Sequence, residues 1–428
     1  MKGGIMTTGN IAIPSVIKKN TVLLMMTQAL LSSSSQLIPS LAGIIVYRFM
    51  GSLVLVGLPI SILGIASSVA SYPSGYIADS LGRRPILMAG LILGGIAAFL
   101  IYYAIVSGSF PLFLAAIALA GLGQGATNQI RVAAIDMYPV HRKAEGLSYV
   151  LAGSILGTFI APLIVNVTAS YAAVYSLDSL SLPWLAVPVI MAVATLFVLL
   201  TRPDTSKIAK NLKEYYPEEG LNGGSNPLSE ELRQTNVASL IRCSPIAIAI
   251  TSLTLSGGAI MIMITSLISM ILKGLDYDLT FITLSVAIHV LGMFGLSMIW
   301  GRLADRYGRK SVLIVGALLI GPGALIAATS STFWFITLGT FLIGLGWSAI
   351  NISATSIIGD LTSPGIRGRL LGISDLIIGL FSVVTPIVAG WVAQIAGFPV
   401  LGISGITLST AILVIGAILR EKEPGVYS

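Results

Sequence analysis

The sequence predicts an all-α integral membrane protein, with twelve transmembrane helices in two pseudo-symmetric six-helix bundles. Three observations support this fold class. Hydrophobic residues make up 55% of the 428 residues and charged residues only 10%, whereas soluble domains carry about 25% charged residues. The apolar residues form long runs separated by short polar loops, and motifs of the first half recur in the second half at a nearly constant spacing.

An α-helix needs about 20 apolar residues to cross the hydrocarbon core of a bilayer. Twelve segments of this sequence reach that length, six in each half of the chain. The first follows Lys18 and Lys19 and is too long for the core of a secretory signal, so we expect it to stay in the membrane. The predicted spans are residues 21–46, 52–73, 85–106, 110–137, 146–168, 181–201, 245–272, 279–300, 311–329, 333–358, 370–395 and 399–420.

The Lys and Arg residues predict the orientation of these spans, because short cytosolic loops retain positive charge. With the N-terminus inside, 21 of the 24 cationic residues lie in inside segments, and only Arg48 and Lys273 lie in outside loops. The sequence therefore predicts a multi-pass protein of the cytoplasmic membrane with both termini in the cytosol. The net charge of +7 does not indicate a nucleic-acid partner, because the cations punctuate apolar runs instead of clustering on a polar surface.

Residues 202–240 interrupt the hydrophobic pattern for 39 positions with charges of both signs and with Gly, Asn and Pro. We predict an N-terminal six-helix bundle over residues 1–201, a cytosolic linker over residues 202–244 and a C-terminal six-helix bundle over residues 245–428. The charges of the linker are typical of a solvated surface, and we assign them no chemistry. The single cysteine, Cys243, excludes an intramolecular disulfide.

A charged motif occurs once in each half. The stretches "GYIADSLGRRP" at 75–85 and "GRLADRYGRKS" at 301–311 share two glycines, an aspartate and two cations in one register, at an offset of 226. A further aspartate stands at the predicted end of the fourth and of the tenth span. The motif residues are Gly75, Asp79, Gly82, Arg83, Arg84 and Asp136 in the first half, and Gly301, Asp305, Gly308, Arg309, Lys310 and Asp360 in the second.

We expect each motif to form a tight turn on the cytosolic side. Gly75 and Gly82 lack a Cβ atom and so permit close backbone approach and positive φ angles. Asp79 can face the N-terminus of a helix of the opposite half, where the helix dipole favours an anion.

Charge pairs are expected beside these turns. Arg83 can reach Asp136 at the end of the fourth span, and Arg309 can reach Asp360 at the end of the tenth. The alternative is that these charges only set the topology, since ion pairs at a membrane surface can contribute little.

The repeated Gly-x-x-x-Asp-x-x-Gly-Arg-[Arg/Lys] loop, with twelve spans and a central linker, resembles the major facilitator superfamily over nearly the whole chain. The resemblance implies a secondary transporter that moves a small solute by alternating access, with the motif contacts joining the halves when it opens outward and separating when it opens inward. We expect no enzymatic activity and no cofactor, and a protein that functions as a monomer in the lipid bilayer. The sequence contains no Walker-type phosphate loop, so ATP is not expected to drive transport directly.

Few titratable residues are expected within the membrane. Arg131 lies deeper than Asp136 on the fourth span, and it could either contact an anionic group in a cavity or pair with Asp136. Asp375 lies a few residues inside the eleventh span. His289 lies about halfway along the eighth span, where an imidazole needs a partner or a wet cavity, and it could bind a metal, carry a proton or only pack.

Methionines surround His289 in the sequence. Five of the 13 fall within residues 261–298, and Met293 lies four residues after His289 on the same helix face. Imidazole and thioether ligands together suit a soft ion such as Cu(I), although methionine is also an ordinary packing residue. Met261 and Met263 are further candidates to line the substrate or ion site.

A narrower resemblance concerns the same residues. "IHVLGMF" at 288–294, with "RVAAID" at 131–136 and "AEGLSYVLAGSILGTFIAPLI" at 144–164, is similar to the copper-importer branch of the superfamily. This resemblance implies a metal site formed by His289, Met293 and Met263. The sequence departs from that branch at Ala259, where the branch has the earlier methionine of its seventh-span pair.

Four functional hypotheses therefore follow from the sequence. The first is a secondary transporter of a small solute. The others are a copper importer of the same superfamily, a proton-coupled exporter of drugs or metabolites and, from another class, a non-transporting membrane receptor, because one fold hosts unrelated functions.

Overall fold

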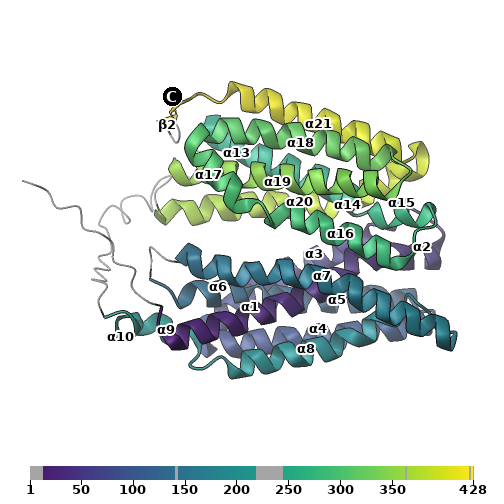
Figure 1. Ribbon diagram of the computed structural model, residues 1–428, viewed down its shortest axis with the longest axis horizontal. Helices are drawn as coiled ribbons and strands as arrows, with labels where there is room; N and C mark the ends of the chain where they lie inside the picture. The colour runs from purple at the N-terminus through teal and green to yellow at the C-terminus, as the bar shows by residue number, and fades with distance from the viewer. Residues whose placement is uncertain (1–12, 140–142, 218–243, 362–363, 424–425, 428) are drawn as a thin grey trace, which may run out of the picture.

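The computed structural model describes residues 13–139, 143–217, 244–361, 364–423 and 426–427. Within this part of the chain, eleven helical segments are long and apolar enough to cross a membrane. The remaining predicted span corresponds to α3 (Leu58–Leu81), a 24-residue helix whose six serines make it more polar than the others. The fold is the predicted one, with twelve membrane helices in two bundles that lie against each other (Figure 1).

The N-terminal half begins with a span in which α1, the π-helix η1 and α2 follow one another. Its fourth span is likewise divided, into α5 and α6, at Asn128. The elements are α1 (Ser15–Ser35), η1 (Ile38–Ala42), α2 (Gly43–Met50), α3 (Leu58–Leu81), α4 (Arg83–Val106), α5 (Phe110–Thr127), α6 (Gln129–Asp136), α7 (Lys143–Tyr175) and α8 (Pro183–Leu200).

The C-terminal half repeats this order. Its first span also contains a π-helix, η4, a feature that is often found at functional sites of helices. The elements are α13 (Ser244–Leu253), η4 (Thr254–Met261), α14 (Ile262–Thr265), α15 (Ile268–Gly274), α16 (Leu279–Phe294), α17 (Ser297–Tyr307), α18 (Arg309–Thr329), α19 (Phe333–Asp360), α20 (Pro364–Ala396) and α21 (Phe398–Ile418).

Short elements follow the last span of each half. Helices α9 (Thr205–Lys210) and α10 (Leu212–Tyr215) come after α8, and the strands β1 (Glu421–Glu423) and β2 (Val426–Tyr427) come after α21. The strands pair in antiparallel fashion, with Glu421 opposite Tyr427. They are the only strands in the described part of the chain.

The start of the predicted linker is packed against the N-terminal half. Ile208 and Tyr216 are buried, the Tyr216 hydroxyl donates to the Met137 carbonyl at 3.4 Å, and the Asn20 amide donates to the Pro203 carbonyl at 3.3 Å. Residues 202–216 are therefore part of the N-terminal body, although the composition of this segment resembles that of a solvated linker.

The duplication extends to the helix contacts. A Cβ atom on Gly90 of α4 would lie 2.8 Å from the Gly123 carbonyl of α5. At the matching place in the second half, a Cβ atom on Gly316 of α18 would lie 2.8 Å from the Gly346 carbonyl of α19. Such small residues let membrane helices approach closely, so the same close helix–helix contact at glycines occurs in both bundles.

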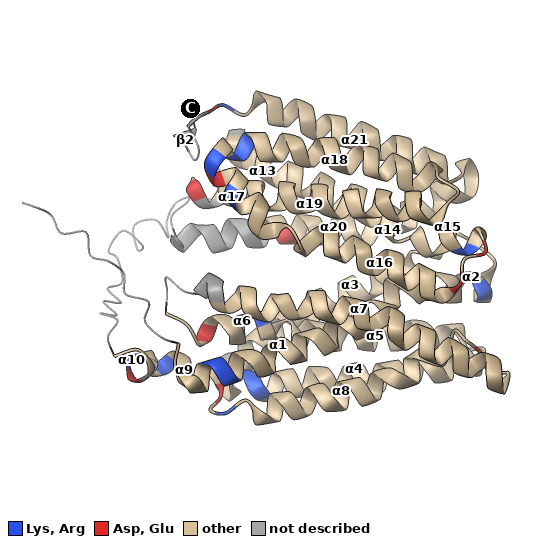
Figure 2. Ribbon diagram, viewed as in Figure 1, with Lys and Arg blue, Asp and Glu red and all other residues tan. Residues whose placement is uncertain are grey.

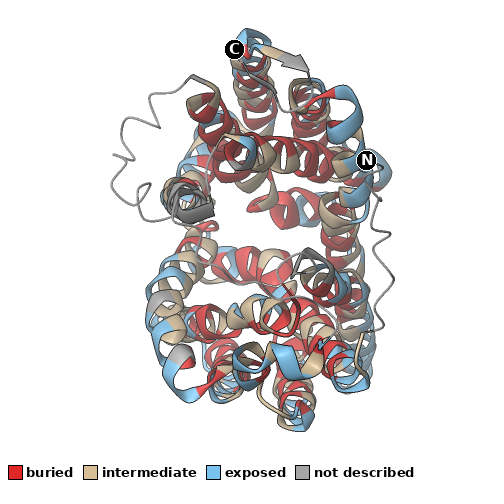
Figure 3. Ribbon diagram, turned by 90° about the vertical axis from the view of Figure 1, so that its left-hand side faces the viewer, coloured by how far each residue is buried: buried red, intermediate tan, exposed pale blue. Residues whose placement is uncertain are grey.

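The molecule has two chemically different ends (Figure 2). We call the end where α3 meets α4 and α17 meets α18 the motif end, and the opposite end, which carries Arg48 and Asp178, the far end. Buried residues gather inside each bundle and exposed ones on its outer faces (Figure 3). The outer faces expose large apolar side chains such as Val69 and Trp334, as expected for helices in contact with lipid.

The two halves touch at the far end. The Ser61 hydroxyl of α3 donates to the Val383 carbonyl of α20 at 2.6 Å, and the Ser52 hydroxyl donates to Oε1 of Gln394 at 2.9 Å. Gly57 packs directly on the backbone of Pro386. Every hydrogen bond between the halves that occurs among the described residues lies at this end.

Candidate functional site

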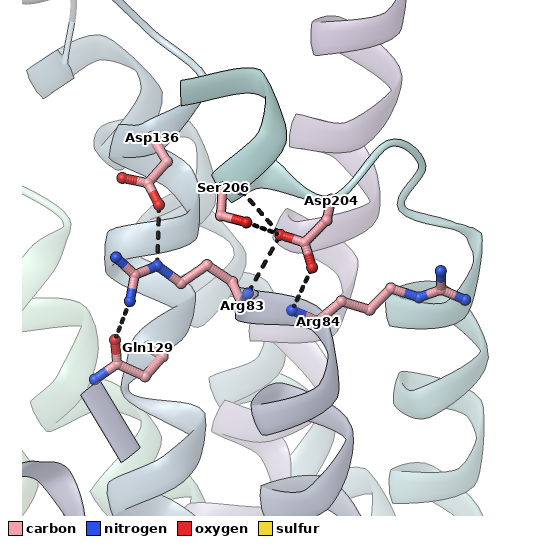
Figure 4. Close-up of polar contacts among 6 residues, drawn as sticks. All are labelled: Arg83, Arg84, Gln129, Asp136, Asp204 and Ser206. Atoms are coloured by element: carbon pink, nitrogen blue, oxygen red, sulfur yellow. Dashed lines mark hydrogen bonds and ion pairs between the residues drawn. The ribbon is translucent and has the colours of Figure 1, made fainter. Parts of the chain in front are cut away.

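The motif of the N-terminal half brings together side chains from three helices (Figure 4). Nε of Arg83, at the start of α4, donates to Oδ2 of Asp136 at the end of α6, at 3.0 Å. The same guanidinium donates to Oε1 of Gln129 at 3.3 Å. The Arg83 and Asp136 side chains are only 12% and 18% exposed, so this pair is more shielded from solvent than an ordinary surface ion pair.

Asp204 supplies a contact that the sequence did not reveal. Its carboxylate accepts hydrogen bonds from the backbone N–H groups of Arg83 at 3.2 Å and Arg84 at 3.0 Å (Figure 4). It also accepts from the backbone and the hydroxyl of Ser206, both at 2.9 Å. The first N–H groups of a helix lack intrahelical partners and carry partial positive charge, so Asp204 caps α4 and anchors the start of the segment after α8.

Gly82 is required at this junction for two reasons. Its φ angle is +98°, a region that other residues rarely adopt. A Cβ atom there would also lie 2.6 Å from Oδ2 of Asp204. The second motif glycine therefore provides both the turn and the space for the capping carboxylate.

The C-terminal half contains the same arrangement with different residues. Nε of Arg309 donates to Oδ2 of Asp360 at 3.3 Å, and its Nη1 lies 2.8 Å from Oδ1 of Asp305. Glu421 takes the place of Asp204, because its carboxylate accepts from the backbone N–H groups of Arg309 at 2.9 Å and Lys310 at 2.8 Å. Each motif helix is thus capped by a carboxylate that follows the last span of its own half.

The role expected for the first motif glycines is wrong. Gly75 lies inside α3 and Gly301 inside α17, and only Gly82 and Gly308 form turns with positive φ. The predicted second span, residues 52–73, ended too early, because the helix continues through the polar motif as far as Leu81. The side chain of Asp79 lies outside the described part of the structure, so its expected contact with the opposite half stays a prediction.

A cavity of about 400 Å³ lies between the two halves. Its N-terminal wall is mixed and carries the polar side chains of the lining, among them Gln28 and Ser154, which share a hydrogen bond of 2.9 Å, and a group of longer side chains on the fourth span. Its C-terminal wall is apolar and comes from α16. The lining includes Gln28, Gln36, Gln124, Asn128, Arg131, Ser154, Trp184, Val290, Met293 and Phe294.

Arg131 lies in this cavity and not at the motif end with Asp136. Asp136 pairs with Arg83 instead. Among the described residues, the guanidinium of Arg131 makes no hydrogen bond and no ion pair at contact distance. Arg131 therefore does not pair with Asp136 in this state, and its contact with an anionic group stays a prediction.

His289 lies beside the central cavity, buried between α16 and α19. Its Nδ1–H donates to the Thr340 carbonyl at 2.7 Å. A carbonyl can only accept, so in the neutral imidazole Nε2 carries the free lone pair. His289 lines a cavity of about 130 Å³ that shares Gln36 and Val290 with the central one.

The predicted soft-metal ligands do not line one cavity. Met293 lines the central cavity, His289 lines the smaller one, and Met263 is buried outside both. Met261 is half-buried and packs on the core of the C-terminal half. Among the described residues, no cluster of three or more His, Cys, Asp or Glu side chains is placed to hold a metal ion.

Two six-helix bundles around a central cavity, with a capped charged turn at one end of each bundle, form an architecture suited to a membrane transport protein. The sequence matches the Major Facilitator Superfamily over residues 22–280 and 246–427. The chain therefore belongs to this superfamily of transporters, whose members are not enzymes.

The chain is similar to the riboflavin transporter RfnT of Brucella anthropi, with 26% identity over 362 residues, which is 84% of this chain and 85% of that protein. Its fold resembles that of a point mutant of the nucleoside transporter NupG, with a TM-score of 0.70 and 17% identity, covering 94% and 99% of the two chains. It also resembles a D-xylose-proton symporter, with a TM-score of 0.66 and 14% identity, covering 93% and 97%.

Proposed function

We propose that this protein is a secondary active transporter that carries a small polar organic solute across the cell membrane by alternating access. One observation carries the proposal: the central cavity lies between two bundles that are hydrogen-bonded to each other only at the far end, as far as the described residues go. A rocking motion of the bundles would open the far end and close the motif end around the same cavity.

The motif contacts fit a role as gate. In this state Arg83 and Arg309 pair with carboxylates of their own halves, while each motif helix keeps a carboxylate cap. We propose that closing the motif end brings these charged turns against the other half, and that their separation is a step of the transport cycle.

The charge distribution supports an orientation. The motif end carries most of the cationic residues, which short cytosolic loops retain. We propose that the motif end and both termini face the cytosol, so that the structure shows an inward-open state. With Cys243 replaced by serine, an impermeant thiol reagent should label Ser80→Cys from the cytosolic side and Ser107→Cys from outside. The reverse labelling pattern would overturn this orientation.

The cavity walls support an organic solute. Amide, hydroxyl and guanidinium groups occur among apolar side chains on the N-terminal wall, and the C-terminal wall is apolar; such a lining is typical of pockets that orient small organic molecules. Relatives and structural neighbours named for riboflavin, nucleoside and xylose transport supply the first probes.

Flux into proteoliposomes tests the function. The full chain is reconstituted, and uptake of riboflavin, uridine and xylose is measured with and without an imposed proton gradient. We expect saturable uptake of at least one probe above that of protein-free vesicles. Specific binding of a probe without any flux across the bilayer would instead indicate a receptor.

A further inference from the structure

A polar stripe runs along the fourth span on the side that faces the central cavity. Gln124, Asn128 and Arg131 stand four and then three residues apart, which places them on one helix face. All three line the cavity. Among the described residues, none of the three side chains makes a hydrogen bond to another protein group. The stripe therefore offers several donors to a molecule in the cavity.

Arg131 is the one charged side chain among the described residues that line this cavity. It is exposed in the present state, so water can hydrate its guanidinium. Closing the motif end would remove that water, and a cation in a dry membrane interior is costly without an anion beside it. The closed state therefore requires an anion near Arg131.

Asp375 can supply such an anion from the opposite half. It lies on α20 and is exposed, and among the described residues it forms no ion pair at contact distance in this state. Arg131 belongs to the N-terminal half and Asp375 to the C-terminal half. Closing the motif end would bring α6 and α20 together and shorten this separation.

The rest of the cavity suits the apolar part of a solute. Val290, Met293 and Phe294 of α16 form the facing wall. The indole N–H of Trp184, which also lines the cavity, is buried and has no hydrogen-bond partner among the described residues.

We propose that Arg131 binds an anionic group, a carboxylate or a phosphate, on the transported solute, and that Asp375 takes the place of this group when the cavity is empty. Asn128 and Gln124 supply further hydrogen bonds to the same group. This inference rests on the proposed transport function and names the chemistry of its substrate. It also means that the empty carrier can close its motif end, because Asp375 then neutralises Arg131.

Matched probes test the binding site. The purified full chain is titrated with benzoate, phenyl phosphate and flavin mononucleotide, and with their neutral counterparts benzamide, phenol and riboflavin. The melting temperature reports binding, because a ligand stabilises the state that it binds. We expect at least one anion to bind about tenfold more tightly than its neutral counterpart, as a charge-assisted hydrogen bond would give. Preference for the carboxylate or for the phosphate identifies the group.

Three variants separate the roles of the residues. Arg131→Gln should abolish the preference for the anion, and Asp375→Asn should raise the affinity for it, because the competing carboxylate is gone. Arg48→Gln is the matched control, since Arg48 pairs with Asp178 at 2.9 Å at the far end, outside the cavity. It should leave anion binding as in the unmodified protein.

A second measurement needs no ligand. Spin labels at Leu81→Cys and Tyr307→Cys, which hold equivalent places in the two motifs, report how far apart the halves lie at the motif end. Asp375→Asn should reduce the population with the short distance, and the exchange of charges in Arg131→Asp with Asp375→Arg should restore it.

The inference is overturned if no anion in the panel is preferred over its neutral counterpart, or if the spin-label distances are the same in all variants. Saturable flux of a neutral solute together with either result would leave the proposed function standing. Absence of flux for every solute would count against the proposed function itself.

Discussion

The far end and the motif end hold the molecule together in different ways. At the far end, the halves meet through close packing, as of Gly57 on the backbone of Pro386, and through neutral hydrogen bonds, as from the Ser61 hydroxyl to the Val383 carbonyl. At the motif end, the ion pairs among the described residues are formed within each half, as between Arg83 and Asp136. Packing contacts act only over a short range and demand close fit, whereas charged groups can exchange partners. Contact between the halves at the far end therefore depends on a close fit of their surfaces. The charged groups of the motif end can instead change partners when the halves move.

The largest effect is expected from breaking the contact between the halves at the far end. A Cβ atom on Gly57 would overlap the backbone of Pro386, which cannot move aside as a side chain could. Overlap of this kind typically costs about 1–3 kcal/mol, so Gly57→Ala should shift the population strongly toward the state with a closed motif end and stop transport. Spin labels at Leu81→Cys and Tyr307→Cys should report a shorter distance.

Gly64, which lies inside α3 seven residues after Gly57, provides the control for this change. No atom lies within 4 Å of the place where its Cβ would be. Gly64→Ala should therefore transport normally and give the unmodified distances. Equal effects of the two substitutions would show that α3 responds to lost flexibility and not to contact with α20.

The next largest effect concerns the motif charge. Arg83→Gln removes the pair with Asp136 and should slow solute exchange by about tenfold, as the loss of one shielded, charge-assisted contact would. Equilibrium binding should stay unchanged, because the turn lies outside the cavity. Asp79→Asn is expected to act in the same way.

Arg84→Gln is the control for Arg83→Gln, because it removes the same charge at the neighbouring position. Nε of Arg84 has no hydrogen-bond partner among the described residues, and its backbone N–H, which Asp204 caps, is kept. This variant should exchange solute at nearly the normal rate. Loss of equilibrium binding in a correctly folded Arg83→Gln protein would contradict the gate and place this turn in the substrate site.

A smaller effect is expected from the caps of the motif helices. Replacing a capping side chain typically costs about 0.5–2 kcal/mol, so Asp204→Ala and Glu421→Ala should each lower the melting temperature of the purified protein. Glu214→Ala removes an exposed charge from the same segment as Asp204 and should leave the melting temperature unchanged. A similar decrease in all three variants would mean that net charge, and not capping, determines the stability.

The smallest effect is expected at Met293. Leucine conserves bulk but removes the sulfur, so Met293→Leu should transport an organic solute at close to the normal rate. His289→Ala should lower transport more, because it removes the hydrogen bond to Thr340. If instead both changes abolish uptake and elemental analysis finds copper in the unmodified protein, the soft-metal hypothesis would replace the organic solute.

The sequence predicted most of the architecture. The twelve spans and the duplication are confirmed, because burial in lipid demands long apolar runs that are visible without knowledge of the fold. The limits of the second span were wrong because α3 is rich in serine and continues into the charged motif. The contacts of Arg83 with Asp136 and of Arg309 with Asp360 were found because the motif occurs twice in one register.

The capping carboxylates were missed for a physical reason. Asp204 and Glu421 bind backbone N–H groups, which every residue has, so no complementary side chain marks their target in the sequence. A signal was nevertheless available, since Asp204 follows the sixth span and Glu421 and Glu423 follow the twelfth within a few residues. The second occurrence would have distinguished Asp204 from the other charges of the apparent linker.

The sequence by itself determined that this is a membrane protein, how many spans it has, that its two halves are duplicated and where its charged turns lie. These properties depend on local composition and on repeated spacing. Only the tertiary structure decided at which end the halves are hydrogen-bonded to each other, and that Arg131 and Met293 share a cavity while His289 lies beside it. Those relations join residues that are far apart in the chain. They depend on how each helix is rotated about its axis and packed against its neighbours. A helix that is apolar on almost every side does not specify this rotation by its own residues.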